Sequence, residues 1–265
     1  AAGLTLPEGS SFDAAFSANT LHIMGWEHVQ ALFAALPPLL RHGALLAVYG
    51  PFNYGGRYTS DSNAQFDAWL QKLEQAELIA FDSETTSIDA QQAQLVGLSF
   101  AVKAGEAAYI PVAHSYMGVP TQLDRDAVLK ALKPILEDPN KAKVGQHAKY
   151  DINVLANCAL DGDPSNGINV QGVAFDSMLE SYVLDSTATR HNMDALALKY
   201  LDYSTIAFED IAGKGAKQLT FDQIALELAG PYAAEDADIT LRLHQTLWGQ
   251  LEAVPGLAKV FSEIE

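Results

Sequence analysis

The sequence predicts an α/β protein, and two observations lead to this fold class. Short apolar runs typical of buried strands alternate with longer segments that carry apolar side chains at helical spacing. Hydrophobic residues make up 49% of the 265 residues, which is enough for a sizeable core. No internal repeat is apparent, so these segments are expected to build one full domain and one partial domain.

The expected elements follow one another along the chain. Residues 12–24 are predicted as a strand and its exit, 26–40 as a helix and 44–49 as a second strand. Further apolar runs predict strands near residues 78–83, 95–102, 107–112, 142–145 and 172–175. Helical spacing predicts helices near residues 124–137, 147–158, 176–184, 192–201, 220–229 and 231–250. Pro231 suits the first turn of the last helix, and Asp176 is expected to cap the helix that follows it.

Four acidic side chains stand out because three separate segments supply them. Asp82 and Glu84 end an apolar strand, where side chains two apart share a face, roughly 6.6 Å apart along the chain. Tyr232 and Asp236 are four apart, so on a helix they lie on one face about one turn apart. Asp151 ends the triplet Lys-Tyr-Asp in the first turn of an expected helix.

Whether these acids converge stays open at this point, because long stretches of chain separate the three segments. Taken singly, an acidic pair at a strand end is more often a solvated loop. If the acids do converge, two carboxylates about 4 Å apart repel by roughly 4 kcal/mol at an effective dielectric constant of about 20. Such a cluster must protonate, spread out or bind cations, and oxygen ligands favour Mg²⁺ or Mn²⁺ over zinc. Two such ions about 3.5–4 Å apart can activate a water and stabilise the leaving oxygen of a phosphodiester.

From about residue 63 to residue 265 the chain closely resembles the 3′–5′ proofreading exonuclease domain of bacterial DNA polymerase I. The resemblance implies an RNase H-like exonuclease fold, in which helices flank a mixed five-stranded sheet. The matching stretches keep the family's order along the chain and are Phe81–Thr85, Leu95–Phe100, Ala108–His114, Lys143–Asp151, Gly172–Asp185, Phe208–Gly215 and Gln218–Leu243.

The resemblance also implies a role for each acid. Asp82 matches the acid that bridges two Mg²⁺ or Mn²⁺ ions, and Glu84 and Asp236 match the other protein ligands of the ion beside the attacking water. Asp151 matches the acid that serves the second ion, and Tyr232 matches the tyrosine that orients the water in the tyrosine-type DEDD class. The implied reaction is hydrolysis of the last phosphodiester, which releases a nucleoside 5′-monophosphate from a DNA 3′ end.

Five further positions match residues that contact nucleic acid in this family. Ile88 and Phe208 match apolar residues that wedge and stack against the terminal nucleotides, which is worth about 1–3 kcal/mol per base. Gln146, His147 and Tyr150 match the remaining contact positions.

Two residues depart from the family's usual pattern. His147 stands where many relatives carry asparagine, and it is expected to alter a hydrogen bond to the terminal nucleotide. Ser83 stands where threonine is common, and it is expected to point away from the site.

Residues 1–65 resemble something else, the later half of a small bacterial family of predicted S-adenosylmethionine-dependent methyltransferases. That resemblance implies a partial Rossmann-like βαβ segment, with Asn19 and His22 near the family's pocket. The Gly-rich turn that cradles the cofactor has no counterpart, and the final strands are missing. Neither S-adenosylmethionine binding nor methyltransferase activity is therefore expected. A gene fusion, or a deletion between two open reading frames, with its join at residues 66–70 would explain the two resemblances.

The expected organisation is a truncated methyltransferase-like segment at 1–65, the exonuclease domain at 66–252, and at 253–265 the start of a linker to an absent polymerase domain. Polymerase activity is not expected. The net charge of −17 is unusual for a nucleic-acid binder, so weak, salt-sensitive binding to a single-stranded or frayed 3′ end of DNA is predicted.

The cysteine count, one apolar stretch and the histidines add expectations about cellular location and residue roles. Cys158 is the only cysteine, which excludes an internal disulfide and fits a reducing cytoplasm. A monomer without membrane contact is expected. The apolar stretch 31–49 is not predicted to span a membrane, because Pro37-Pro38 and Arg41-His42 interrupt it. Structural roles are expected for the three histidines without ligand-like spacing, His114, His191 and His244. Two alternatives remain, an RNase D-like RNA 3′ exonuclease and an inactive nucleic-acid-binding fusion fragment.

Overall fold

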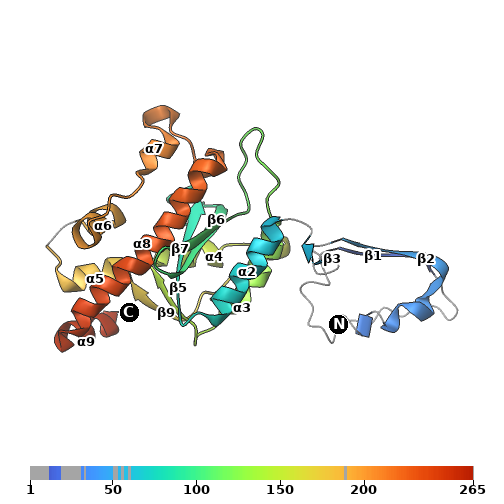
Figure 1. Ribbon diagram of the computed structural model, residues 1–265, viewed down its shortest axis with the longest axis horizontal. Coiled ribbons are helices and arrows are strands. Elements are labelled where there is room, and N and C mark those ends of the chain that lie inside the picture. The colour runs from blue at the N-terminus through green and yellow to red at the C-terminus, as the bar shows by residue number, and fades with distance from the viewer. Residues whose placement is uncertain are drawn as a thin grey trace. The chain divides into compact units, whose positions relative to one another are not determined.

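The computed structural model of the chain describes residues 12–18, 31–32, 34–49, 53–54, 57–58, 61–187 and 190–264 (Figure 1). Contacts between residues divide the chain into two compact units, Ala1–Gln65 and Phe66–Glu265. Among the helices in the described ranges, none combines the length and the apolarity needed to cross a lipid bilayer.

In the first unit, β1 (Phe12–Ala18) pairs in parallel with β2 (Leu40–Tyr49), as a βαβ segment requires. The predicted helix 26–40 extends too far, because the 3₁₀ helix η2 (Pro37–Leu39) and then β2 occupy its last residues. The two adjacent prolines account for this, since proline lacks the N–H that a continuing α-helix needs. β3 (Asn53–Tyr54) and β4 (Arg57–Tyr58) form a short antiparallel pair. The predicted pocket residues Asn19 and His22 lie outside the described residues.

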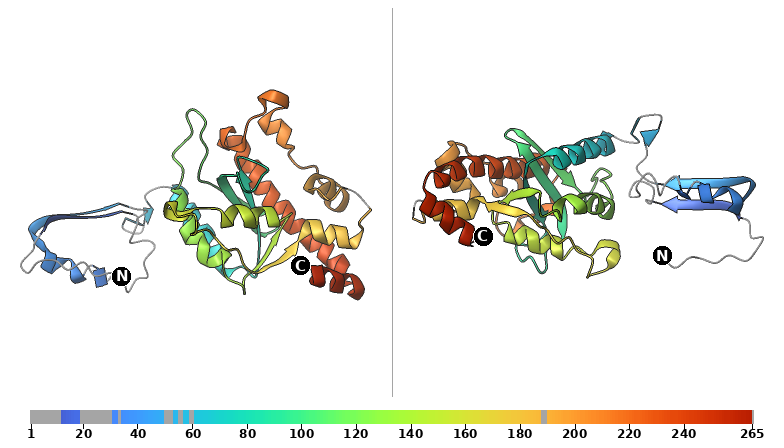
Figure 2. Two further views of the ribbon diagram at one scale, coloured as in Figure 1. Left: turned by 180° about the vertical axis from the view of Figure 1, so that it is seen from behind. Right: turned by 90° about the horizontal axis from the view of Figure 1, so that it is seen from below.

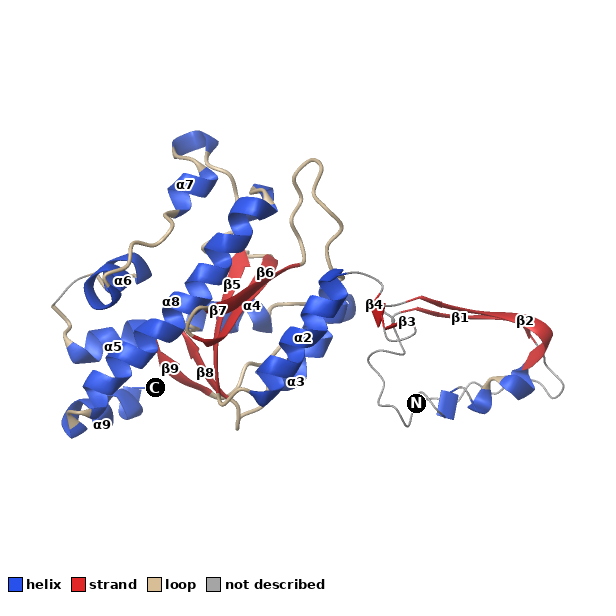
Figure 3. Ribbon diagram, in the orientation of Figure 1, coloured by secondary structure: helices blue, strands red, loops and turns tan. Residues whose placement is uncertain are grey.

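The second unit is built on a mixed five-stranded sheet that helices surround (Figure 3). The strand order is β7-β6-β5-β8-β9, and central β5 pairs antiparallel with β6 and parallel with β8. The strands are β5 (Leu78–Thr85), β6 (Leu95–Lys103), β7 (Glu106–Pro111), β8 (Ala142–Gly145) and β9 (Val173–Asp176). The predicted fold class is thus confirmed, and each predicted strand in this unit is found close to its expected bounds.

The helices of this part include three that the sequence patterns do not predict, α2, α7 and α9. The α-helices are α2 (Asp61–Gln75), α3 (Arg125–Leu136), α4 (Lys149–Ala156), α5 (Ser177–Leu184), α6 (Met193–Leu201), α7 (Phe208–Ala212), α8 (Leu226–Glu252) and α9 (Pro255–Ile264). Short 3₁₀ helices are η3 (Leu160–Gly162), η4 (Gly215–Lys217) and η5 (Phe221–Gln223). Helix α9 lies within the stretch 253–265, and its buried Phe261 lies 5.5 Å from the ring of Trp248.

Helix α8 differs from the prediction of two helices at 220–229 and 231–250. Residues 226–252 form one helix, and Pro231 lies inside it rather than in its first turn. Proline removes only one intrahelical hydrogen bond, while the buried side of this helix continues on both sides of it, at Ala229 and Ala233. Burial of that continuous side against the sheet therefore outweighs the local signal of the proline.

The two faces of the sheet are covered by different helices (Figure 2). On one face α8 packs on the sheet, where Ala237 and Leu241 of the helix form a buried cluster with Ala80, Ala101 and Val144 of the strands. On the other face α3 and α4 pack on the odd-numbered side chains of β5, including Phe81. Side chains alternate along a strand, so the even-numbered residues of β5 face α8.

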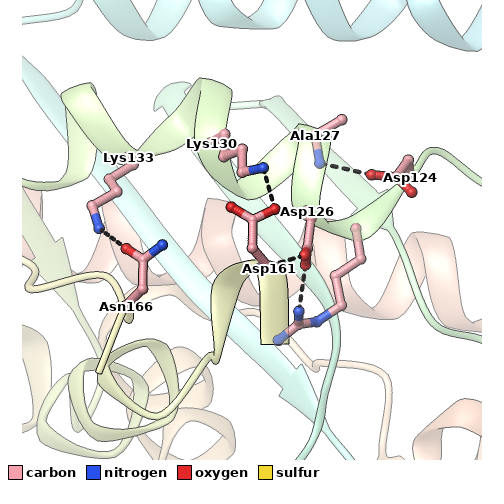
Figure 4. Close-up of polar contacts among 8 residues, drawn as sticks. Asp124, Asp126, Ala127, Lys130, Lys133, Asp161 and Asn166 are labelled. Atoms are coloured by element: carbon pink, nitrogen blue, oxygen red, sulfur yellow. Dashed lines mark hydrogen bonds and ion pairs between the residues drawn. The ribbon is translucent and has the colours of Figure 1, made fainter. Parts of the chain in front are cut away.

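Polar contacts fasten the loop after α4 onto α3 (Figure 4). Lys130 Nζ lies 2.5 Å from Asp161 Oδ1, and Lys133 Nζ donates to Asn166 Oδ1 at 3.0 Å. Gly167 is required at this crossing, because an added Cβ would lie 1.9 Å from a backbone oxygen of α4. The loop thereby holds α4 in place against the sheet.

Lys143 in β8 is fully buried and carries a testable share of the stability of this unit. Its Nζ donates to the carbonyl oxygens of Asp138 (3.0 Å), Lys141 (2.9 Å) and Gln171 (2.8 Å). Lys143→Met is expected to lower the free energy of unfolding by about 1–3 kcal/mol, because buried carbonyls lose their donor. Urea denaturation measures this, with Lys103→Met at an exposed position as the control. Equal midpoints for the two variants would contradict the expectation.

Candidate active site

The carboxyl end of β5 carries two of the predicted acids on the face that α8 covers. Asp82 and Glu84 point to this face, and Asp236 reaches it from α8. One carboxylate oxygen from each of the three side chains lies within 4.8 Å of the others. The structure therefore brings together three acids from two distant segments.

Asp151 comes to the same strand end from the other face of the sheet. β8 runs parallel to β5, so its carboxyl end delivers α4, with Asp151 in the first turn, to this edge. The Asp151 carboxylate accepts hydrogen bonds from the Ser83 backbone N–H at 3.0 Å and from the Ser83 hydroxyl. The expectation that Ser83 points away from the site was wrong. Alternation does turn Ser83 away from Asp82 and Glu84, but Asp151 lies on that side.

The turn between β8 and α4 is held by Asp176, the last residue of β9. Its carboxylate accepts from the backbone N–H groups of His147 (3.2 Å) and Ala148 (2.8 Å). It also accepts from Met178 (2.9 Å) and Leu179 (3.2 Å), which confirms its predicted role as the cap of α5. One side chain thus fixes the start of α5 and the entry to the helix that carries the fourth acid.

The electrostatics of the four acids are those of a buried cluster of like charges. Burial raises the pKa of Asp82 to about 6, although the Ser83 N–H acts in the opposite direction. Burial, followed by the charges of Asp82, Asp236 and Asp151, raises the pKa of Glu84. Burial and then the charge of Asp82 also raise the pKa values of Asp151 and Asp236. Asp82 thus interacts with each of the other three carboxylates.

This donor set fits a divalent cation. In the part of the chain that the structure describes, the buried Glu84 Oε1 has no hydrogen-bond partner. A buried polar atom in that state is costly unless a ligand pairs with it. The candidate ligand atoms are carboxylate oxygens, which suit hard cations, and bound positive charge would offset their mutual repulsion.

Tyr232 adds a hydrogen-bond donor to the cluster. It lies on α8 one turn before Asp236, and its hydroxyl acts to lower the pKa of the Asp236 carboxyl group. Burial, followed by the charges of Asp236, Glu84 and Asp82, raises the pKa of Tyr232. The hydroxyl therefore stays protonated at neutral pH and remains available to donate.

The two predicted apolar contact residues lie in different surroundings. Phe208 begins α7, and its half-buried ring lies 6.0 Å from Tyr232 and 6.4 Å from Phe221, parallel to the latter. Ile88 is 99% exposed in the loop that follows β5. The Tyr150 hydroxyl holds this loop through hydrogen bonds with the Thr85 hydroxyl and the Ser87 carbonyl oxygen.

Gln146 and His147 line a pocket of about 520 Å³ together with Arg190 and His191. The Gln146 side chain is fixed there, because its Nε2 donates to the His191 carbonyl oxygen at 3.0 Å and its Oε1 accepts from Ser177. His147 adopts a left-handed backbone conformation (φ 62°) and is exposed. Sequence reasoning missed Arg190, because no periodicity or motif marks the loop in which it stands.

Comparison with known proteins identifies this arrangement. Residues 58–252 match the 3′–5′ exonuclease family, and residues 3–100 match a family of proteins of unknown function. The chain is 78% identical over 202 residues to DNA polymerase I of Pseudomonas aeruginosa, covering 76% of this chain and 22% of that protein. It is 36% identical over 232 residues to DNA polymerase I of Rhizobium leguminosarum, covering 81% of this chain and 22% of that protein. The chain thus spans about a fifth of the length of these relatives.

Solved structures share the fold at low sequence identity. Trypanosoma brucei RNase D aligns with a TM-score of 0.54 and 17% identity, over 76% of this chain and 69% of that chain. Brucella melitensis NrnC aligns with a TM-score of 0.51 and 20% identity, over 72% of this chain and 80% of that chain. The Aedes aegypti Nibbler EXO domain aligns with a TM-score of 0.51 and 18% identity, over 76% and 91%. The fold is therefore RNase H-like, and with residues 58–252 matched, the chain belongs to the 3′–5′ exonuclease family whose domain is found in DNA polymerase I.

Proposed function

We propose that this chain is an active two-metal-ion 3′–5′ exonuclease that removes nucleoside 5′-monophosphates from DNA 3′ ends. The observation that carries the proposal is the meeting of Asp82, Glu84 and Asp236, with Asp151 beside them, at the carboxyl end of β5. Residues 66–252 form the proposed catalytic unit, acting as a cytoplasmic monomer, and residues 1–65 have no proposed part in the reaction.

The four acids would hold two Mg²⁺ or Mn²⁺ ions. Asp82, Glu84 and Asp236 would hold the first, since their carboxylate oxygens lie within 4.8 Å of one another. Asp82 with Asp151 would hold the second, since the charge of Asp82 also raises the pKa of Asp151. Two such ions, when bound, activate a water and stabilise the leaving 3′ oxygen of a phosphodiester.

Tyr232 is proposed to orient the attacking water. Its hydroxyl is protonated and acts on the Asp236 carboxyl group, so it would supply a hydrogen-bond donor beside the cluster. Preorganised donors of this kind lower the barrier because they need no reorientation during the reaction.

The terminal nucleotides are proposed to lie between apolar and polar contacts. Phe208 would stack on a base, and Ile88, fully available to a ligand, would wedge between the last nucleotides. Gln146 and His147 would contact the nucleotide from the pocket that Arg190 also lines, where a guanidinium suits a phosphate. Tyr150 would contribute mainly by holding the loop that carries Ile88. A single-stranded or frayed 3′ end is the form of DNA that such contacts accept.

One assay tests the proposal directly. Single-stranded DNA labelled at its 5′ end is incubated with the protein in Mg²⁺, Mn²⁺ or EDTA, beside single-stranded RNA of the same sequence. We expect a ladder that shortens from the 3′ end of DNA with either cation, and no shortening in EDTA or with Asp236→Ala. RNA shortened as fast as DNA would favour an RNase D-like activity instead. DNA that stays intact in both Mg²⁺ and Mn²⁺ would favour the alternative of an inactive nucleic-acid-binding fragment.

A further inference from the structure

His114 is buried just after β7, and both nitrogens of its ring have partners. Nδ1 lies 3.1 Å from the carbonyl oxygen of Ile224, and Nε2 lies 2.8 Å from the hydroxyl oxygen of Tyr109. A carbonyl oxygen only accepts, so Nδ1 carries the proton in this contact. In the neutral ring Nε2 is then an acceptor, and the Tyr109 hydroxyl donates to it. Burial lowers the pKa of His114, which favours this neutral form.

These contacts join the end of β7 to the segment that begins α8. Ile224 lies two residues before the helix starts, and the backbone N–H of Leu226, its first residue, donates to the Tyr116 hydroxyl at 3.2 Å. The Ser115 backbone N–H donates to the Asp222 carbonyl oxygen at 2.8 Å. The start of the helix that carries the catalytic tyrosine is therefore fixed to the loop after β7.

Packing continues this connection to Tyr232 itself. The ring of Tyr109 lies 6.2 Å from that of Phe221, which in turn lies 6.0 Å from the ring of Tyr232. Tyr109 lies directly over Gly97, where an added Cβ would come within 2.3 Å of its hydroxyl oxygen. Gly97 pairs with Glu84 across the β5–β6 ladder. The ring of Tyr109 therefore lies over β6, the neighbour of the strand that carries the acids, and contacts the aromatic side chains that pack on Tyr232.

We propose that Tyr109 and His114 are positioning residues, whose shared hydrogen bond holds Tyr232 in place against the carboxylate cluster. Neither side chain is proposed to touch the substrate. The inference rests on the proposed function, and in particular on the role of Tyr232 in the reaction.

A double-mutant cycle on DNA shortening tests the proposal. Tyr109→Phe keeps the ring and removes the donor, and His114→Asn keeps an N–H for Ile224 and removes the acceptor. Each is expected to lower kcat about tenfold, with KM within about twofold, and the two together no more than either alone, because both remove one bond. In a Tyr232→Phe background, the same changes should lower kcat by less than about twofold. Tyr200→Phe is the control, because Tyr200 lies on α6 and packs in a separate cluster with Ile239, Leu243 and Leu247, further along α8.

Hydrogen exchange of the backbone amides at residues 226–229 supplies a readout that does not depend on activity. Exchange should be faster in Tyr109→Phe and His114→Asn than in the parent chain or in Tyr200→Phe. Equal losses of kcat with and without Tyr232, a loss in only one of the two variants, or unchanged exchange would overturn the proposal. Faster exchange with unchanged kcat would also overturn the proposal, because it would show that Tyr109 and His114 stabilise the start of α8 without affecting the reaction. A parent chain that leaves DNA intact would instead refute the proposed function, while exchange would still test the hydrogen bond.

Discussion

Asp82→Asn is expected to lower the rate of DNA shortening about a thousandfold or more. The charge of Asp82 raises the pKa values of Glu84, Asp151 and Asp236, and both proposed cation positions use its carboxylate. Loss of several kcal/mol of transition-state stabilisation corresponds to this factor, since each 1.4 kcal/mol is about tenfold. Asparagine keeps the size of the side chain, which separates lost charge from lost packing.

Steady-state kinetics in saturating Mg²⁺ measure the loss. Asp163→Asn, at an exposed position in the loop after η3, is the matched control and should keep the parent rate. Circular dichroism should show both variants folded. A folded Asp82→Asn chain that keeps a tenth or more of the parent rate would show that the carboxylate cluster is not the catalytic centre.

Stability without cations is expected to fall as the pH rises from about 4 through about 6 and above. The folded pKa of Asp82 is about 6 against an ordinary value of 3.8, so between these values the folded state binds more protons than the unfolded state. Its stabilising contribution is complete below the ordinary pKa and is lost as the pH passes through the folded pKa. The raised pKa values of Glu84, Asp151 and Asp236 act in the same direction and extend the fall to higher pH.

Divalent cations should reverse this fall, because they bind the deprotonated carboxylates. At about pH 8, Mg²⁺ or Mn²⁺ at about one hundred times its dissociation constant should raise the melting temperature by about 5–10 °C. At about pH 5 the rise should be smaller, since protons compete for the same oxygens. Differential scanning fluorimetry in EDTA and in each cation measures both effects.

Glu84→Gln provides the comparison for this experiment. It removes one buried carboxyl group from the cluster, so it should flatten the fall in EDTA and reduce the gain from cations. Asp163→Asn should behave as the parent chain does. Parallel pH profiles for the parent chain and Glu84→Gln would show that these acids do not set the pH dependence.

Much of the second unit could be predicted because its signals are local. The strand bearing Asp82 and Glu84 is an apolar run that ends in acids, and the spacing of Tyr232 and Asp236 by itself places both on one helical face. The cap formed by Asp176 is likewise a local pattern, and it was found where expected.

The errors arose where contacts from distant residues decide the outcome. Pro231 favours a helix start, yet the helix begins earlier because its continuous apolar side is buried on the sheet. The Ser83 side chain points away from Asp82 and Glu84, as alternation along a strand predicts. Only the folded structure shows that Asp151 lies on the side to which Ser83 points. Arg190 was recognised only from the structure, because the pocket that it lines is formed by residues from separate segments of the chain.

The alanine contact between α8 and the sheet has a consequence for how this domain can change over time. Aspartate is a short side chain, and Asp236 meets Asp82 and Glu84 beside a contact in which Ala237 packs with Ala80 and Ala101. The volumes of the side chains at positions 80, 101 and 237 are therefore expected to affect the distance between Asp236 and the acids of β5. Substitution of these alanines by larger residues during evolution would then lower the rate of the proposed reaction even in a domain that still folds.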